Sequence, residues 1–279
     1  MNAANYMDAE QPMAEYLATP AISAGAINRG RMSMLHMHQK MTGPEKPETP
    51  PMRLGRLIHA AILEPDAFFQ QAQVWHGPKR GKEWTAFKDE HDPEWIVTAE
   101  EQADLLKMSN RVHADPTAHR LIDRTHHELS GYWTDDDYGV AKIRCDGYGE
   151  KAGILELKST ARIAPYSFQR TAAQLGYHLK CGWYAYGIER ITGKRPMVHI
   201  VSVEQQAPFD VIVYVVQDNL IDMGRDEAIE IAKRYNACRL MEHFPGIVGA
   251  GEVQVLELPA WATGGEDWIP EEAQNESLA

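Results

Sequence analysis

The chain has few cysteines and no long apolar run. Its three cysteines, Cys145, Cys181 and Cys238, are far apart and form no CxxC pair. This spacing argues against a zinc ribbon, an iron–sulfur cluster or a disulfide framework, and it is typical of a reducing compartment. No apolar run approaches the roughly 20 residues that a membrane-spanning helix needs. The first residues also lack a basic stretch followed by an apolar stretch, so we expect neither secretion nor membrane association.

Basic residues are missing from the C-terminal part of the chain, because residues 240–279 contain no Lys or Arg. The net charge of −12 by itself disfavours nucleic-acid binding. All 28 Lys and Arg residues precede residue 240, however, so the balance there is much closer to neutral. A nucleic acid responds to the local charge of a surface rather than to the sum over a chain, so the net charge is a weak argument for or against this class of partner.

Composition divides the 279 residues into three parts. Residues 1–50 are rich in Met, Ala and Pro and predict a helix over Ile22–His36, capped by Ser23, followed by a linker at 40–51. Residues 51–243 contain most of the periodic pattern and are expected to form one domain. Residues 244–279 are acidic and Gly-rich and predict a flexible tail. The whole chain is 44% hydrophobic and 24% charged, which is typical of a globular protein.

Hydrophobic periodicity in residues 51–243 predicts alternating groups of helices and strands. Thr98 and Glu101 form a candidate capping box at the start of one helix. The polar residues 78–92 predict a loop. The helices are expected at 53–63, 98–113, 166–191 and 219–243, and the strands at 129–134, 139–146, 153–158, 196–204 and 209–216. This order predicts an α/β fold around one mixed β-sheet flanked by helices.

The most informative segment is 144–158, which reads RCDGYGEKAGILELK. Asp146 precedes Glu156 by ten residues, and a Gly-rich turn separates their strands, so a hairpin would bring the two carboxylates together. Glu156 and Lys158 share one face of the second strand because side chains alternate. Two carboxylates form an oxygen-rich site for a hard cation such as Mg²⁺, and a lysine beside them can orient a water molecule. The alternative is a charged face of an antiparallel hairpin that is merely solvated.

Five motifs in this order resemble those of a known family. They are GRLIHAAILEP with His59, HELSGYWTDDDYG with Glu128, RCD with Asp146, ELKST with Glu156 and Lys158, and YHLKCGWYAYG with Tyr184. In this order and spacing the chain resembles the PD-(D/E)XK nuclease superfamily, and within it the exonuclease VIII (RecE-like) branch of phages and prophages. One departure is that Lys180 stands where the family's QxxxY motif has Gln.

The resemblance implies a restriction-endonuclease-like core and a bound Mg²⁺, for which Mn²⁺ is a substitute. It implies that Asp146 and Glu156 are direct metal ligands, with the Leu157 carbonyl as a third. His59 and Glu128 would complete a first or a second metal position. Lys158, as a catalytic residue together with Asp146 and Glu156, would orient the attacking water or contact the scissile phosphate.

A second set of residues is predicted to contact DNA rather than metal. Tyr177, Lys180 and Tyr184 lie at i, i+3 and i+7 on one face of a predicted helix, although such a stripe is more often packing. Arg144, beside Asp146, is the fourth candidate.

The resemblance also implies an activity and partners. It implies digestion of linear double-stranded DNA, 5′ to 3′, for phage-type recombination in the cytoplasm of a bacterial host. A homo-oligomer that encloses the DNA and a single-strand annealing protein are the implied partners. Two alternatives remain open from the residues: a non-catalytic DNA-binding or assembly module, and an endonuclease on the same fold.

Overall fold

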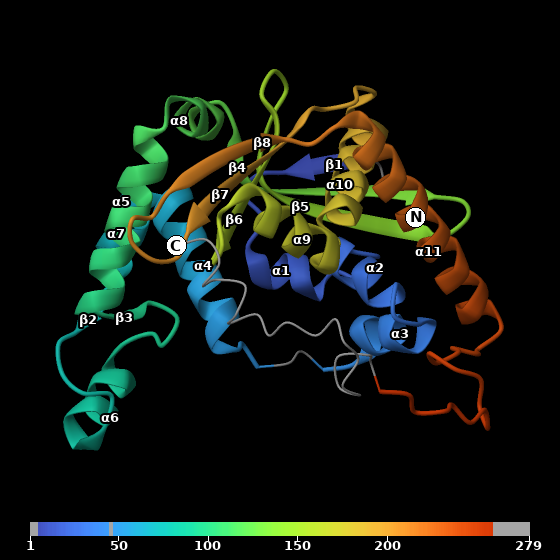
Figure 1. The fold of residues 1–279 in the computed structure, drawn as a ribbon, viewed down its shortest axis with the longest axis horizontal. Coiled ribbons are helices and arrows are strands. Elements are labelled where there is room, and N and C mark those ends of the chain that lie inside the picture. Colours follow the sequence, from blue (N-terminus) through green and yellow to red (C-terminus); the bar gives the residue numbers. More distant parts are fainter. Residues whose placement is uncertain (1–4, 45–46, 259–279) are drawn as a thin grey trace, which may run out of the picture. The chain divides into compact units, whose positions relative to one another are not determined.

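The computed structural model describes residues 5–44 and 47–258. The described residues up to Phe244 form one compact unit, and the described residues from Pro245 on belong to a second. In the first unit a six-stranded sheet has the strand order β1-β4-β5-β6-β7-β8, with helices against it (Figure 1). The predicted α/β fold with a central mixed sheet is therefore confirmed. The six strands are β1 (Tyr6–Asp8), β4 (His126–Asp135), β5 (Gly139–Gly149), β6 (Gly153–Thr160), β7 (Val198–Glu204) and β8 (Val211–Val215).

The sheet is mixed because one of its five strand pairs is parallel. β6 runs parallel to β7, and the other four pairs are antiparallel. A parallel pair needs a long crossover, and here the chain passes through α9 (Pro165–Leu175) and α10 (Tyr177–Thr192) between β6 and β7. This crossover carries three of the predicted DNA-binding residues to the face of the sheet beside β6.

Each face of the sheet packs on its own hydrophobic cluster. Along β6, Ile154 belongs to one cluster, whereas Leu155 and Leu157 belong to the other, as the alternation of a strand requires. The first cluster joins the sheet to α2 (Ala24–Gly30), α3 (Met34–Thr42), α9, α10 and α11 (Asp218–Leu240). The second joins it to α4 (Pro50–Leu63), α5 (Pro65–Gln71), α7 (Ala99–Ala114) and α8 (Pro116–Asp123). Residues 24–42 are thus part of the same compact unit as the sheet.

Two long helices predicted from the sequence are interrupted. The helix expected at 166–191 is divided into α9 and α10 at Gly176, whose φ of 71° is left-handed and suits a residue without a Cβ. The helix expected over Ile22–His36 ends at Gly30, and α3 starts after Ser33, whose hydroxyl accepts from the His36 amide at 3.2 Å. The predicted Ser23 cap is confirmed, since its hydroxyl accepts from the Ala26 amide.

The predicted loop at 78–92 is wrong, because it contains α6 (Gly81–Glu90). Aromatic contacts stabilise this helix. The rings of Trp84 and Phe87 lie 5.4 Å and 5.0 Å from Trp75 of β2 (Gln73–Trp75), which pairs in parallel with β3 (Ile96–Thr98). The predicted linker at 40–51 is also shorter than expected, because α3 continues to Thr42 and α4 starts at Pro50. The capping box of Thr98 and Glu101 is confirmed at the start of α7.

The described part of the predicted acidic tail, residues 245–258, contains no helix or strand. Its apolar side chains are largely exposed, and Val253 is 92% exposed. Residues 259–279 of that tail lie outside the described residues. Among the helices of residues 5–44 and 47–258, none is long and apolar enough to cross a membrane.

Two glycines allow α10 and α11 to cross closely. A Cβ added to Gly224 of α11 would collide with the backbone carbonyl of His178, and one added to Gly182 of α10 would collide with the backbone of Arg225 and Gly224. Backbone atoms cannot move aside as a flexible side chain does. The crossing fixes α10 on the sheet and therefore fixes the residues that α10 presents to β6.

We expect Gly224→Ala to destabilise the protein by about 1–3 kcal/mol, since overpacking against backbone forces the helices apart. Gly55→Ala in α4 is the matched control, because nothing lies within 4 Å of its added Cβ. Alanine there should stabilise the helix by up to about 1 kcal/mol. Urea unfolding measures both variants, and a Gly224→Ala protein as stable as wild type would contradict the close crossing.

Candidate active site

Neighbouring strands place three carboxylates side by side. The pairs His127↔Gly147 and Leu129↔Cys145 put Glu128 of β4 opposite Asp146 of β5. The paired residues of β5 and β6 end with Gly147↔Leu155. Asp146 precedes Gly147 and Glu156 follows Leu155, so the same antiparallel register places Asp146 next to Glu156. The Leu157 amide donates to Asp146 Oδ2 at 2.7 Å. The predicted hairpin therefore brings Asp146 and Glu156 to neighbouring positions.

Glu128 has an unusual backbone. Its φ of 51° is left-handed, a conformation that costs energy in a residue with a side chain and that is found preferentially at functional sites. Its carboxylate accepts from Arg144 Nε at 2.9 Å. The same guanidinium donates to Ser130 Oγ at 2.8 Å and to the Gln11 carbonyl at 2.9 Å. Arg144 therefore fixes the position of the Glu128 carboxylate.

His59 reaches the carboxylates from the helix α4. The buried Leu57, Ile58, Ala61 and Ile62 hold this helix in the second cluster, which also contains Leu155 and Leu157 of β6. His59 Nδ1 lies 3.7 Å from Asp146 Oδ1. One donor atom from each of His59, Glu128 and Asp146 lies within 4.8 Å of the others. The structure thus brings together three of the five predicted metal ligands from α4, β4 and β5.

The surroundings lower the pKa of the Asp146 carboxyl group and raise that of Glu128. Burial raises the pKa of Asp146, but His59, Lys180, Lys158 and the Leu157 amide outweigh it and lower that pKa to about 2. Burial and the neighbouring Asp146 carboxylate raise the pKa of Glu128, and Arg144 opposes them only in part. Asp146 is therefore the more firmly ionised of the two carboxylates.

Glu156 is the most deeply buried carboxylate of the site, with 2% of the residue exposed. Its Oε1 accepts from the ammonium groups of both Lys158 and Lys180. Its Oε2 is buried and has no hydrogen-bond partner. An unpaired buried carboxylate oxygen is costly, so this atom is a candidate ligand for a cation. Lys158 also donates to the Leu157 carbonyl at 3.0 Å.

The residues fit a divalent cation. His59, Glu128 and Asp146 supply one nitrogen and two carboxylate donors that lie within 4.8 Å of one another. Glu156, which follows on the strand paired with that of Asp146, adds the buried Oε2 that has no hydrogen-bond partner. Carboxylate-rich donor sets suit Mg²⁺ and Mn²⁺, and the imidazole is also compatible with Mn²⁺. The Leu157 carbonyl, also predicted as a ligand, accepts from Lys158 at 3.0 Å, and its role as a ligand stays a prediction.

The predicted DNA-binding residues surround this site. The ammonium of Lys180 lies 5.0 Å from the Tyr184 ring centroid, and that of Lys158 lies 5.5 Å from the Tyr177 ring centroid. Tyr184 is 6% exposed and belongs to the first hydrophobic cluster. Arg144 is engaged with Glu128, Ser130 and Gln11. Contact with DNA by any of these four residues stays a prediction.

A segment that no sequence pattern linked to the site packs beside it, at the end of α1 (Met13–Ala18). The buried Lys142 ammonium donates to the carbonyls of Tyr16 at 2.6 Å and Thr19 at 2.7 Å in this segment. The same Tyr16 ring lies 5.7 Å from the Arg144 guanidinium. Lys142 and Arg144 alternate with apolar residues in β5, which indicates a polar face, but no pattern in the sequence identifies its partner.

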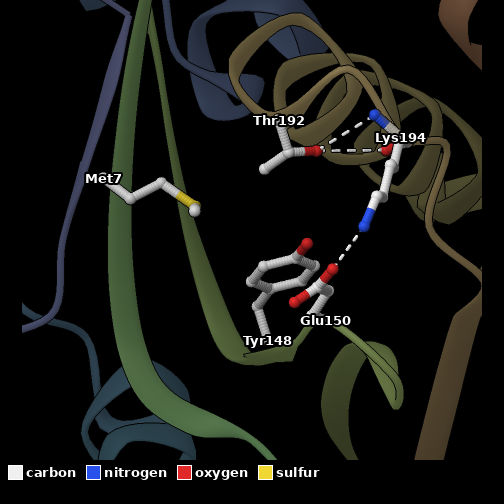
Figure 2. Close-up of a pocket in the computed structure, with 5 residues that line it drawn as sticks. All are labelled: Met7, Tyr148, Glu150, Thr192 and Lys194. Carbon is white, nitrogen blue, oxygen red and sulfur yellow. Dashed lines mark hydrogen bonds and ion pairs between the residues drawn. The ribbon is translucent and has the colours of Figure 1, made fainter.

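A pocket lies elsewhere in the unit and contains none of the predicted site residues. Figure 2 shows its lining, with the Tyr148 ring below Thr192 and the exposed ion pair of Glu150 and Lys194 at its rim. Met7 of β1 closes the other side. Its lining includes one carboxylate, that of Glu150, and none of the candidate metal ligands.

Comparison with known proteins is consistent with this geometry. Residues 28–258 match the model of a family described as a PDDEXK-like domain of unknown function (DUF3799). The chain belongs to this family. The match covers His59, Glu128, Asp146, Glu156 and Lys158 and begins after α1, so the α1 segment of this PDDEXK-like protein precedes the matched region. No curated protein matches the chain.

A solved structure shares the fold of this PDDEXK-like domain. It is a crystal structure described as a "Putative exonuclease" from Eubacterium rectale, with a TM-score of 0.57 and 12% sequence identity. The similarity covers 92% of this chain and 99% of the other. At this identity the likeness establishes the fold, and the activity is argued below.

We expect Asp146→Asn to destabilise the metal-free protein at pH 7 by about 2 kcal/mol, because the folded-state pKa of Asp146 lies well below its ordinary value. A lowered pKa stabilises the folded state above about pH 4, and that contribution is lost as the pH falls toward 2. Urea unfolding in EDTA at pH 7 and pH 3 should show the difference between wild type and variant shrinking. The exposed Asp89→Asn is the control, and an Asp146→Asn protein as stable as wild type at pH 7 would contradict the assigned environment.

Proposed function

We propose that the protein is a metal-dependent deoxyribonuclease that degrades linear double-stranded DNA. The observation that carries the proposal is the convergence of His59, Glu128 and Asp146 beside Glu156, whose second oxygen is buried and unpaired. A Lys158 ammonium lies at the same carboxylate. This is a site for a divalent cation with a cationic group next to it, within a PDDEXK-like family.

Phosphodiester hydrolysis requires a nucleophilic water, charge neutralisation and a stabilised leaving group. A divalent ion supplies these by lowering the pKa of water and polarising the phosphate. His59, Glu128, Asp146 and Glu156 would hold the ion. Lys158 is held by Glu156 and by the Leu157 carbonyl, so its ammonium is positioned to orient water or contact a phosphate oxygen. A fixed donor of this kind stabilises charge without rearranging in the transition state.

Exonuclease action on DNA ends is the finer part of the proposal. The five motifs that resemble the exonuclease VIII (RecE-like) branch support it, and the structural neighbour from Eubacterium rectale is itself described as a "Putative exonuclease". The proposal includes 5′ to 3′ digestion for phage-type recombination by a cytoplasmic homo-oligomer that works with a single-strand annealing protein. We expect the protein to contact the DNA phosphates rather than the base edges, since an enzyme that acts on DNA ends does not need to read the sequence.

We expect the protein with Mg²⁺ or Mn²⁺ to degrade linear duplex DNA and to leave closed circular duplex intact. EDTA should abolish the activity, because the carboxylates alone neutralise no phosphate charge. Gel analysis over time with 5′- or 3′-end-labelled duplexes measures the activity and its polarity. Cutting of the circles would identify an endonuclease. DNA binding without cleavage of either form would identify a non-catalytic module and would reject the proposed function.

We expect Lys158→Ala to lower turnover at least ~100-fold while DNA binding largely survives, because Lys158 acts at the reacting phosphate. The variant Lys194→Ala removes an exposed lysine that also pairs with a glutamate, and it should retain wild-type turnover. Single-turnover cleavage and a DNA-binding titration separate the two effects. Wild-type turnover by the Lys158→Ala protein would show that this lysine has no part in catalysis.

A further inference from the structure

Lys180 differs from Lys158 in its access to solvent. Both ammonium groups contact Glu156 Oε1, but the Lys180 side chain is 30% exposed and that of Lys158 is 16% exposed. Lys180 projects from α10 across to β6, whereas Lys158 lies on the same strand as Glu156. Lys180 is therefore the partner that can leave Glu156 without disturbing the sheet.

Opposite charges balance at the site. Three carboxylates, Glu128, Asp146 and Glu156, lie in one site with three cationic side chains, Arg144, Lys158 and Lys180. Arg144 pairs with Glu128, and both lysines contact Glu156. Asp146 lies beside His59 and feels the charge of both lysines. A divalent cation added to such a balanced site has no excess negative charge to neutralise it. Its two positive charges are also repelled by the nearby ammonium groups, and this repulsion is strong where the site is shielded from bulk water. The balance disfavours cation binding as long as Lys180 remains at Glu156.

A DNA phosphate changes this balance. The ammonium of Lys180 lies 5.0 Å from the Tyr184 ring centroid, and its side chain is partly exposed although Glu156 is buried. A flexible lysine stem allows this ammonium to turn toward an arriving phosphate. Lys158 would then remain as the ammonium at Glu156, while the phosphate contributes negative charge to the site. Release of Lys180 removes one positive charge from Glu156 Oε1, so the Glu156 carboxylate can bind a cation more strongly.

We propose that Lys180 couples metal binding to DNA binding: it occupies Glu156 in the free protein and transfers to a backbone phosphate when DNA binds, so that the cation binds tightly only with DNA present. The inference rests on the proposed function, because it assumes a nuclease that uses both ligands. Its basis is the shared Glu156 oxygen, the unpaired second oxygen and the greater exposure of Lys180.

The test compares Ca²⁺ affinity with and without DNA by calorimetry, in wild type and in Lys180→Gln. Ca²⁺ is the probe because it binds oxygen-rich sites, and a gel after each titration checks that the short duplex is intact. In the absence of DNA the Lys180→Gln protein should bind Ca²⁺ about tenfold tighter than wild type, within the usual range of coupling between sites. Duplex DNA should tighten Ca²⁺ binding by a similar factor in wild type and by much less in the variant.

Two further variants make the comparison specific. Lys194→Gln removes the same charge from an exposed Lys–Glu pair and should bind Ca²⁺ as wild type does. Lys180→Met removes the charge and the donor while keeping most of the stem, so that the conclusion does not depend on one variant folding. Glu156 keeps Lys158 in both Lys180 variants, so neither leaves it without a counter-ion.

The outcomes separate the inference from the function on which it rests. Wild type that cleaves linear DNA and binds Ca²⁺, together with Lys180 variants whose DNA-free Ca²⁺ affinity is unchanged or weaker, overturns the inference alone. The inference is also overturned if the variants bind Ca²⁺ tighter but keep the full effect of DNA. Wild type that neither binds Ca²⁺ or Mn²⁺ nor cleaves DNA overturns the proposed function.

Discussion

Burial of the Glu156 carboxylate is the constraint on which the site depends. A charge taken out of water is tolerated only when other charges and hydrogen bonds replace the solvent. Here the replacement comes from Lys158 on the same strand and from Lys180 on α10. The position of α10 on the sheet must therefore place Lys180 at Glu156. The close crossing of α10 and α11 at Gly182 and Gly224 fixes that position. Packing between α10 and α11 therefore helps to determine whether Glu156 is neutralised.

Much of the core follows from local patterns in the sequence. The alternation in 139–158 predicts β5, β6 and their hairpin, because strand and turn signals are contained in those residues. The breaks at Gly176 and Ser33 were not predicted, since the apolar pattern continues across both positions. The helix α6 was missed because residues 78–92 are mostly polar and read as a loop, whereas Trp84 and Phe87 of the helix pack on Trp75 of a short strand. Tertiary contacts thus decide where these helices start and end.

The candidate site was predictable in its residues but not in its contacts. His59 is one histidine on a mostly apolar helix, and the resemblance of its surrounding motif singled it out; the structure adds its position 3.7 Å from Asp146. Lys180 was expected to face DNA, and the structure adds its contact with Glu156. The pairing of Lys142 with the end of α1 is invisible in the sequence because 126 residues separate Lys142 from Tyr16.

That separation has a consequence for folding during synthesis. The carbonyls of Tyr16 and Thr19 can accept from Lys142 only after β5 has left the ribosome. The α1 segment therefore cannot complete these contacts until β5 has been made. Contacts of such long range slow folding, because a long loop must close before they form. A newly made chain would therefore complete β4 and β5 before α1 docks beside Arg144, so α1 becomes ordered later than its place in the chain suggests.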